Sequence, residues 1–236
     1  MGRLLHAEFY KLVHDKIYWI TFTAILLFNM ILLSGSSVLS FTGQEALAES
    51  MEKEIVTILI VCIYEGLFIG DDFAGRTLYH SLSAGKSRSS VLFAKSAVSL
   101  IAADGLLFFF PLLLILTCTV KNGWGASAFV QPQRMISMTI AFLILGFAVG
   151  GISLLAAVCF RDVGRTIGIP ILLYFFMILL LNGSASPVFS RILPVGILVL
   201  LANGSVSPYY GILIGTLWIA VLEAVSILIF RRSELR

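Results

Sequence analysis

Three acidic residues lie inside long apolar stretches of this 236-residue chain: Glu65, Asp104 and Glu223. Along a helix they lie about 9, 13 and 12 Å from Asp71, Lys95 and Arg231, the charged residues that bound those stretches. Acids at such depth are costly and usually face a wet cavity or the interior of a helix bundle. Two interpretations are open. The acids pair locally, snorkel or stay protonated, or they form an acidic patch on a substrate pathway that favours cationic amphiphiles.

Other side chains of catalytic type are scarce. All three histidines lie in polar segments: His6, His14 and His80. All three cysteines lie in apolar runs without metal-ligand spacing, which is typical of buried small hydrophobes: Cys62, Cys118 and Cys159. No HExxH or GxSxG motif and no Ser-His or Cys-His pairing is present. The sequence therefore predicts no catalytic residue and no metal site.

The composition decides which elements carry the three acids. Hydrophobic residues make up 59% of the chain and charged residues only 12%, about half the charge of a soluble domain. These values exclude a water-soluble enzyme and predict an all-α integral membrane protein with one domain, residues 1–236. Six apolar runs can form transmembrane helices: 18–40, 55–70, 91–120, 135–160, 167–181 and 209–230.

A seventh apolar stretch, residues 192–202, is too short to be a span. Eleven residues rise about 16 Å as a helix, half of the ~30 Å hydrocarbon core. We expect it to form an outer re-entrant hairpin before the last span. With six spans, 12 of the 16 Lys and Arg residues lie on the inner side, which predicts cytoplasmic N- and C-termini in a plasma membrane. The first run has 23 residues and exceeds the 7–15 of a signal-peptide core, so we expect no cleavage.

The residues before the first span predict an amphipathic helix over about 1–17. Leu5, Phe9, Leu12 and Val13 fall on one helical face, which would lie along the inner membrane surface. This helix is either a simple anchor or an elbow that contacts a cytoplasmic partner.

Residues 71–90 form the longest polar stretch on the inner side. Asp71 and Asp72 are favourable near the start of a short helix, and Ala84-Gly85 would end it. A rigid helix joined to two spans would transmit force, whereas the alternative is an ordinary solvated loop.

Three glycine pairs have small-xxx-small spacing and permit close helix packing: Gly66–Gly70, Gly146–Gly150 and Gly211–Gly215. Chance matches are expected among 20 glycines, so these pairs identify no dimer face.

The order of these parts, together with the segment GLFIGDDFAGRTLYHSLSAGKSRSS and the N-terminal AEFYKL, resembles the membrane permeases of ABC-type exporters. The resemblance is to the type V export class, which includes drug, bacitracin and lantibiotic-immunity permeases. It implies a coupling helix over about Asp72–Ser83 that docks on a separate ATPase. The implied coupling residues are Asp72, Phe73, Arg76, Thr77, Leu78, His80, Ser81 and Leu82.

The chain has no GxxxxGK[ST] loop, so it would bind no cofactor itself, and ATP and Mg would bind to the partner. The resemblance implies two kinds of partner, an ABC ATPase subunit and a second permease subunit, the same or related. It also implies a bacterial cell membrane and export of a hydrophobic or amphiphilic molecule, such as an antimicrobial peptide, a drug or a lipid-like compound. The alternatives are an ion-coupled secondary transporter, although no inverted repeat relates residues 1–118 to 119–236, and an intramembrane enzyme.

Overall fold

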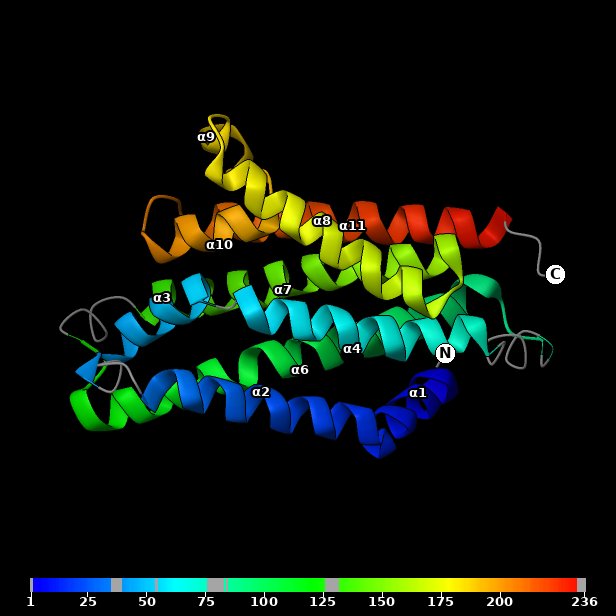
Figure 1. Cartoon of the computed structure of the whole chain (residues 1–236), viewed down its shortest axis with the longest axis horizontal. Coiled ribbons are helices and arrows are strands. Elements are labelled where there is room, and N and C mark those ends of the chain that lie inside the picture. Colours follow the sequence, from blue (N-terminus) through cyan, green and yellow to red (C-terminus); the bar gives the residue numbers. More distant parts are fainter. Residues whose placement is uncertain are drawn as a thin grey trace.

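The structure is a computed structural model of the chain that describes residues 2–34, 40–53, 55–75, 83, 85–125 and 132–232. All regular elements in these ranges are helices. Six of them have 19 residues or more and lie roughly along one axis in Figure 1: α2 (Lys16–Ser34), α4 (Ile55–Ala74), α6 (Arg88–Asn122), α7 (Pro132–Phe160), α8 (Val163–Asn182) and α11 (Pro208–Arg232). The shorter helices are α1 (Gly2–His14), α3 (Gly43–Lys53), α9 (Ser186–Phe189) and α10 (Pro194–Ala202).

Four described helices are long and apolar enough to cross a membrane: α6, α7, α8 and α11. The expected all-α membrane class is confirmed to this extent. The apolar part of α2, Lys16–Ile31, is shorter. Helix α4 has 20 residues but carries Glu65, Asp71 and Asp72.

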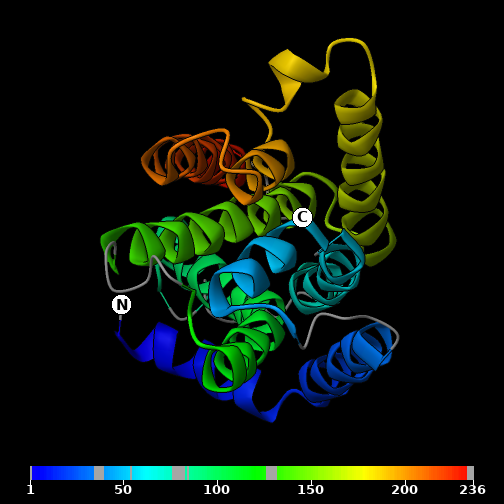
Figure 2. The ribbon, with the colours of Figure 1, turned by 90° about the vertical axis from the view of Figure 1, so that its left-hand side faces the viewer.

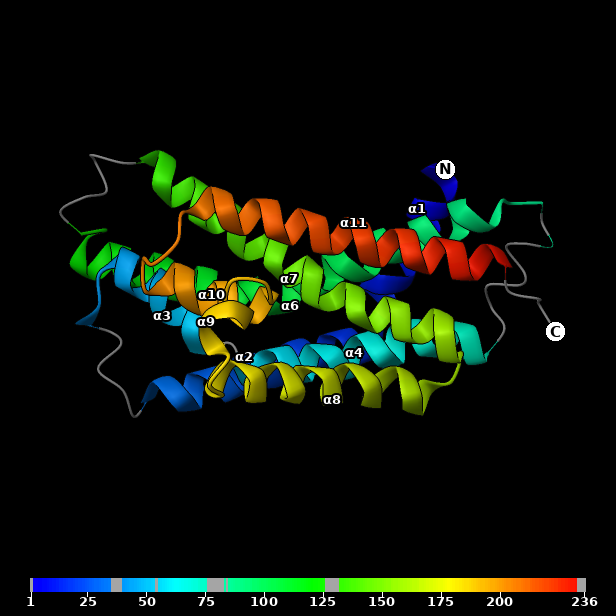
Figure 3. The same ribbon diagram turned by 90° about the horizontal axis from the view of Figure 1, so that it is seen from above.

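Helix α7 is the centre of the bundle. Within its membrane-length window 72% of the residues are buried, against 17% for α11, so α7 is surrounded by protein and α11 lies at the periphery. Figure 2 shows α10 and α11 on one side of α7 and α4 and α6 on the other. Figure 3 shows α11 running alongside α7. Small residues on α7 allow its neighbours to pack closely.

The absence of a side chain at Gly66 allows α4 and α8 to pack closely. A Cβ atom added to Gly66 would lie 2.9 Å from the Cα atom and 3.0 Å from the backbone nitrogen of Ile167. Since backbone atoms cannot move aside, only glycine allows this approach. The Gly66–Gly70 pair therefore packs helices within one chain, as its spacing permits.

Helix α3 was not expected, because its sequence GQEALAESMEK is polar. A capping box starts it: the Thr42 backbone N–H and hydroxyl donate to Glu45 Oε2, each at 2.9 Å. These two hydrogen bonds hold the pKa of the Glu45 carboxyl below its usual value. Ala46 and Leu47 of α3 are buried in a hydrophobic cluster with residues of α6, α7 and α10.

Hydrogen bonds identify the two ends of the bundle. At one end the Arg88 guanidinium donates to the Arg231 carbonyl at 3.1 Å, which joins the start of α6 to the end of α11. Helix α1 lies near the same end in Figure 1. At the other end the Gly43 backbone N–H donates to the Gly123 carbonyl at 3.1 Å, which joins the start of α3 to the end of α6.

Helix α10 occupies the seventh apolar stretch. Its nine residues rise about 14 Å, which is less than half of the ~30 Å hydrocarbon core. Its side chains Ile197, Leu198 and Leu201 are buried in the cluster that also holds α3. The sequence was right that this stretch is too short for a span.

Candidate functional site

A cluster of charges centred on the buried residues Lys95 and Asp72 joins α1, α4 and α6 at the end of the bundle that holds Arg88 and Arg231. Lys95 of α6 is fully buried and forms ion pairs with Asp72 of α4 and with Glu8 of α1, the latter at 3.2 Å. Lys11 of α1 pairs with the other carboxylate oxygen of Asp72. Among the described residues the cluster contains two cations and two anions, whose formal charges cancel.

An aromatic ring completes the cluster. The Lys95 ammonium lies 3.8 Å from the centroid of the Phe68 ring, and the Lys11 ammonium lies 5.2 Å from it. Both distances suit cation–π interactions, which gain strength where water is excluded. Burying charges is costly, and the pairing offsets that cost only in one geometry. The charge cluster therefore fixes how α1 sits against α4 and α6.

The implied coupling residues fall into two groups. Asp72 and Phe73 lie in the last turn of α4, because this helix continues to Ala74 rather than ending at Gly70 as expected. They therefore belong to a long helix and do not begin a separate short one. Phe73 is buried and makes an edge-to-face contact with Phe230 of α11, with ring centroids 5.8 Å apart. The other implied residues lie outside the described residues: Arg76, Thr77, Leu78, His80, Ser81 and Leu82.

The N-terminal helix forms as α1, and the expected apolar face only partly contacts the bundle. Leu12 is buried and Leu5 is partly buried, whereas Phe9 and Val13 are exposed. The ion pair between Glu8 and Lys95 turns the Glu8 side of α1 toward the bundle. A signal was available in the sequence: Lys95 is a lone cation inside an apolar run and needs an acidic partner.

The three predicted intramembrane acids divide into a pair and a single residue. Glu223 of α11 accepts a hydrogen bond from the Ser96 hydroxyl of α6 at 2.8 Å. Glu65 of α4 and Asp104 of α6 are buried against α7, with exposed fractions of 0% and 6%. Their carboxyl groups meet α7 at Gly150 and Gly146, which are one helical turn apart.

Two glycines of α7 make room for the pair. A Cβ atom added to Gly150 would lie 3.0 Å from each Glu65 carboxyl oxygen, and one added to Gly146 would lie 2.5 Å from Asp104 Oδ1. The Gly146–Gly150 spacing, expected to bring helix backbones together, here receives two carboxyl groups one helical turn apart.

The acid pair lacks hydrogen-bond partners. Ser153 of α7 faces Glu65 closely enough to interact with it. Even so, both oxygens of each acid and the Ser153 hydroxyl have no hydrogen-bond partner of normal geometry within the described part of the chain. This is uncommon, because most buried polar atoms in native proteins are satisfied.

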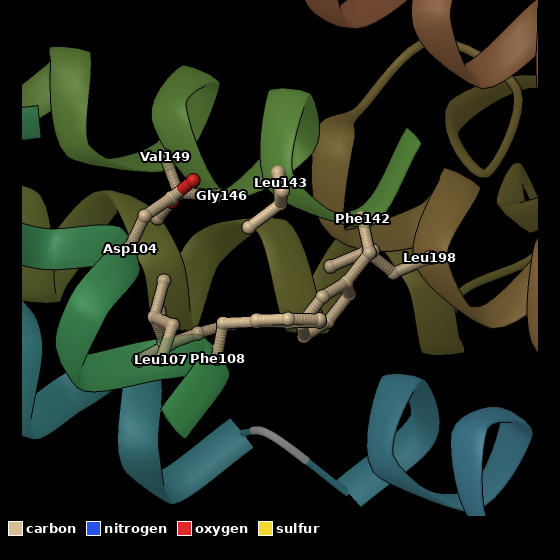
Figure 4. A pocket seen from close by; sticks show the side chains of 9 residues that line it. Asp104, Leu107, Phe108, Phe142, Leu143, Gly146, Val149 and Leu198 are labelled. Atoms are coloured by element: carbon tan, nitrogen blue, oxygen red, sulfur yellow. The ribbon is translucent and has the colours of Figure 1, made fainter. Parts of the chain in front are cut away.

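A small cavity adjoins Asp104. Figure 4 shows the Asp104 carboxyl group directed toward α7 beside Gly146, with Leu107, Phe108 and Phe142 further along the cavity. Its volume is about 10 Å³, which is close to the space that one water molecule requires. In this conformation the cavity cannot hold an amphiphile.

Metal ligation has no support in the ranges described, where no group of three or more His, Cys, Asp or Glu side chains could hold an ion. Two of the cysteines, Cys62 and Cys118, are buried as expected. Cys159 is exposed near the end of α7, so the expectation that all three are buried was wrong.

Comparison with known proteins found no matching family model, no matching curated protein and no matching solved structure.

Proposed function

We propose that this chain is the transmembrane permease subunit of an ATP-driven ABC exporter. In this proposal a separate ATPase binds ATP and Mg, and a second permease subunit, the same or related, completes the pathway. The residue pattern around 68–88 suggests the family. The observation that carries the proposal is the charge cluster, which binds α1 to α4 and α6, the two helices that flank residues 76–82.

The charge cluster connects helices in the way that transmission of force from an ATPase to the membrane helices would require. A load on residues 76–82 reaches both α4 and α6, because the segment joins them directly. The ion pairs of Lys95 with Asp72 and Glu8 extend this connection to α1, and the bond from Arg88 to the Arg231 carbonyl extends it to α11. Four helices would then move together when an ATPase pushes on residues 76–82.

The proposed topology has six spans, with α2 and α4 added to the four apolar helices of membrane length. The charge cluster and both termini then lie in the cytoplasm of a bacterial cell, and α1 lies on the inner membrane surface. Residues 192–202 form the outer re-entrant hairpin. The substrate is hydrophobic or amphiphilic and enters from the bilayer or its inner face. Because the cavity beside Asp104 is water-sized, this cavity would have to widen before it could admit a substrate.

Co-purification tests the proposal. The tagged chain should bring down an ABC ATPase encoded beside it in equal amounts, and the complex in vesicles should hydrolyse ATP. Leu78→Pro should uncouple hydrolysis from transport while the protein still inserts. Ser184→Pro, in an exposed turn far along the chain between α8 and α9, is the matched control and should leave coupling intact.

Normal transport by Leu78→Pro at normal expression would refute the coupling assignment.

One observation favours a second candidate function, an ion-coupled secondary transporter. The carboxyl groups of Glu65 and Asp104 have no hydrogen-bond partner in the described part of the chain. Transport by the chain alone, driven by a proton gradient without ATP, would establish that candidate and reject the first.

A further inference from the structure

Glu65 and Asp104, which pack against α7, have no cation among the described residues to neutralise them. On α4 the titratable neighbours are Cys62 and Tyr64, which supply no positive charge. On α6 the only basic residue within the apolar stretch is Lys95, which is already engaged by Asp72 and Glu8. Residues 145–153 of α7 contain no ionisable side chain, and Glu223 of α11 is itself an acid.

Without a cation, the protonated form of each carboxyl group is the form that this environment tolerates. An ionised carboxylate buried without a partner is very unfavourable, whereas a neutral acid is far less so and can donate a hydrogen bond. Two adjacent carboxyl groups also disfavour double ionisation. Bilayer-depth acids of this kind mark proton relays in other membrane proteins.

The surroundings of the pair allow proton exchange. The cavity beside Asp104 has space for about one water molecule, and a water that enters it would lie next to the carboxyl group and could accept a proton. Ser153 is fully buried with an unused hydroxyl group on the Glu65 side, so it can donate a hydrogen bond to a carboxylate. Gly146 and Gly150 keep the space on α7 open.

We infer that Glu65, Asp104 and Ser153 form a proton-binding site within the helical bundle. On release, the O–H bond of a carboxylic acid breaks and a water molecule that enters the cavity takes the proton and leaves as hydronium. The carboxylate that remains keeps both bonding electrons and is stabilised by the Ser153 hydroxyl on the Glu65 side. Uptake is the reverse reaction. The site binds protons whether or not the chain works with an ATPase.

Infrared spectroscopy of the purified protein in lipid nanodiscs tests the site directly. At pH 7 the protein should show the carbonyl stretch of a protonated carboxylic acid, and Glu65→Gln and Asp104→Asn should each remove part of it. Both substitutions keep the side-chain shape. In D₂O the wild-type band should shift, because the proton exchanges with water. It should disappear as the pH is raised.

Two matched controls accompany this experiment. Glu45→Gln alters a fully exposed carboxylate and should leave the acid band unchanged. Gly146→Ala would place a methyl group against Asp104 Oδ1 and should shift the Asp104 part of the band, whereas Gly168→Ala, which faces open space, should not. The inference fails if neither acid variant reduces the band. It also fails if the wild-type band is unaffected by D₂O or by raised pH, since the protons would then be locked in the structure.

Discussion

Lys95 is the residue on which the charge cluster depends. It is fully buried, pairs with two acids from two other helices and lies over the Phe68 ring. Removing one partner from a buried ion pair leaves the other charge uncompensated, which costs about 3–5 kcal/mol. We therefore expect Lys95→Met to lower the free energy of unfolding by about that amount, measured by denaturant titration in detergent.

The same titration includes two comparisons. Lys121→Met, at the exposed far end of α6, should change stability little, because surface charges contribute less than about 1 kcal/mol. The double variant Lys95→Met with Glu8→Gln should recover part of the loss, because Glu8 loses its ion-pair partner within the described residues when Lys95 is removed, whereas Asp72 keeps Lys11. Equal effects of Lys95→Met and Lys121→Met would contradict the importance of the cluster.

The sequence identified the three intramembrane acids but not the role of Lys95. It singled out Glu65, Asp104 and Glu223 because acids in apolar runs are conspicuous without any knowledge of the fold. It could not separate the pair from Glu223, since the Ser96 hydrogen bond joins residues 127 positions apart. It treated Lys95 as a boundary charge, because its partners Glu8 and Asp72 come from segments that only the bundle brings together.

At the scale of elements, the contact between α4 and α8 depends on Gly66. Gly66→Ala would press a methyl group onto the Ile167 backbone, and such overpacking costs about 1–3 kcal/mol. Gly168→Ala is the control: nothing lies within 4 Å of its added Cβ atom, and alanine is the better helix former by about 1 kcal/mol. Thermal unfolding should show a lower midpoint for Gly66→Ala and an equal or higher one for Gly168→Ala. Equal midpoints for the two variants would mean that α4 and α8 are not in close contact.

The capping box of α3 makes this helix sensitive to pH. The pKa of Glu45 is lowered in the folded helix, so its contribution is present above the unfolded pKa and is lost as pH falls through the folded value. Amide hydrogen exchange at the start of α3 should therefore accelerate at acidic pH, relative to the exchange expected for an unfolded chain at that pH. In Glu45→Gln this pH dependence should vanish. Persistence of the full dependence in that variant would assign it to another group.

Helix α3 also shows where sequence patterns reach their limit. Long apolar runs located α6, α7, α8 and α11 within a few residues, because membrane-length hydrophobicity is a local signal. Helix α3 is polar on average, and its buried hydrophobic residues among those described, Ala46 and Leu47, are too few to predict burial. Its packing against α6 and α10 is a tertiary property that no local pattern contains.

At the scale of the whole molecule, the bundle has two distinct ends. The Arg88–Arg231 contact and the charge cluster lie at the end that we propose is cytoplasmic. The contact of Gly43 with Gly123 lies at the other end, as do the turns around α9 and α10. This arrangement suits the positive-inside rule, because the basic residues of α1, of the first two turns of α6 and of the end of α11 gather at one end. The proposed orientation thus depends on α10 not crossing the membrane.

Cysteine labelling tests this orientation, with one engineered cysteine at a time in a chain whose own three cysteines are replaced. Ser184 and Ser205 are exposed and lie on either side of α10, whereas Lys86 and Arg232 lie at the proposed inner end. Because α10 rises only about 14 Å, we expect Ser184→Cys and Ser205→Cys both to react with an impermeant maleimide in intact cells. Lys86→Cys and Arg232→Cys should react only after permeabilisation. If α10 crossed the membrane, Ser184→Cys and Ser205→Cys would lie on opposite sides and only one of them would react in intact cells.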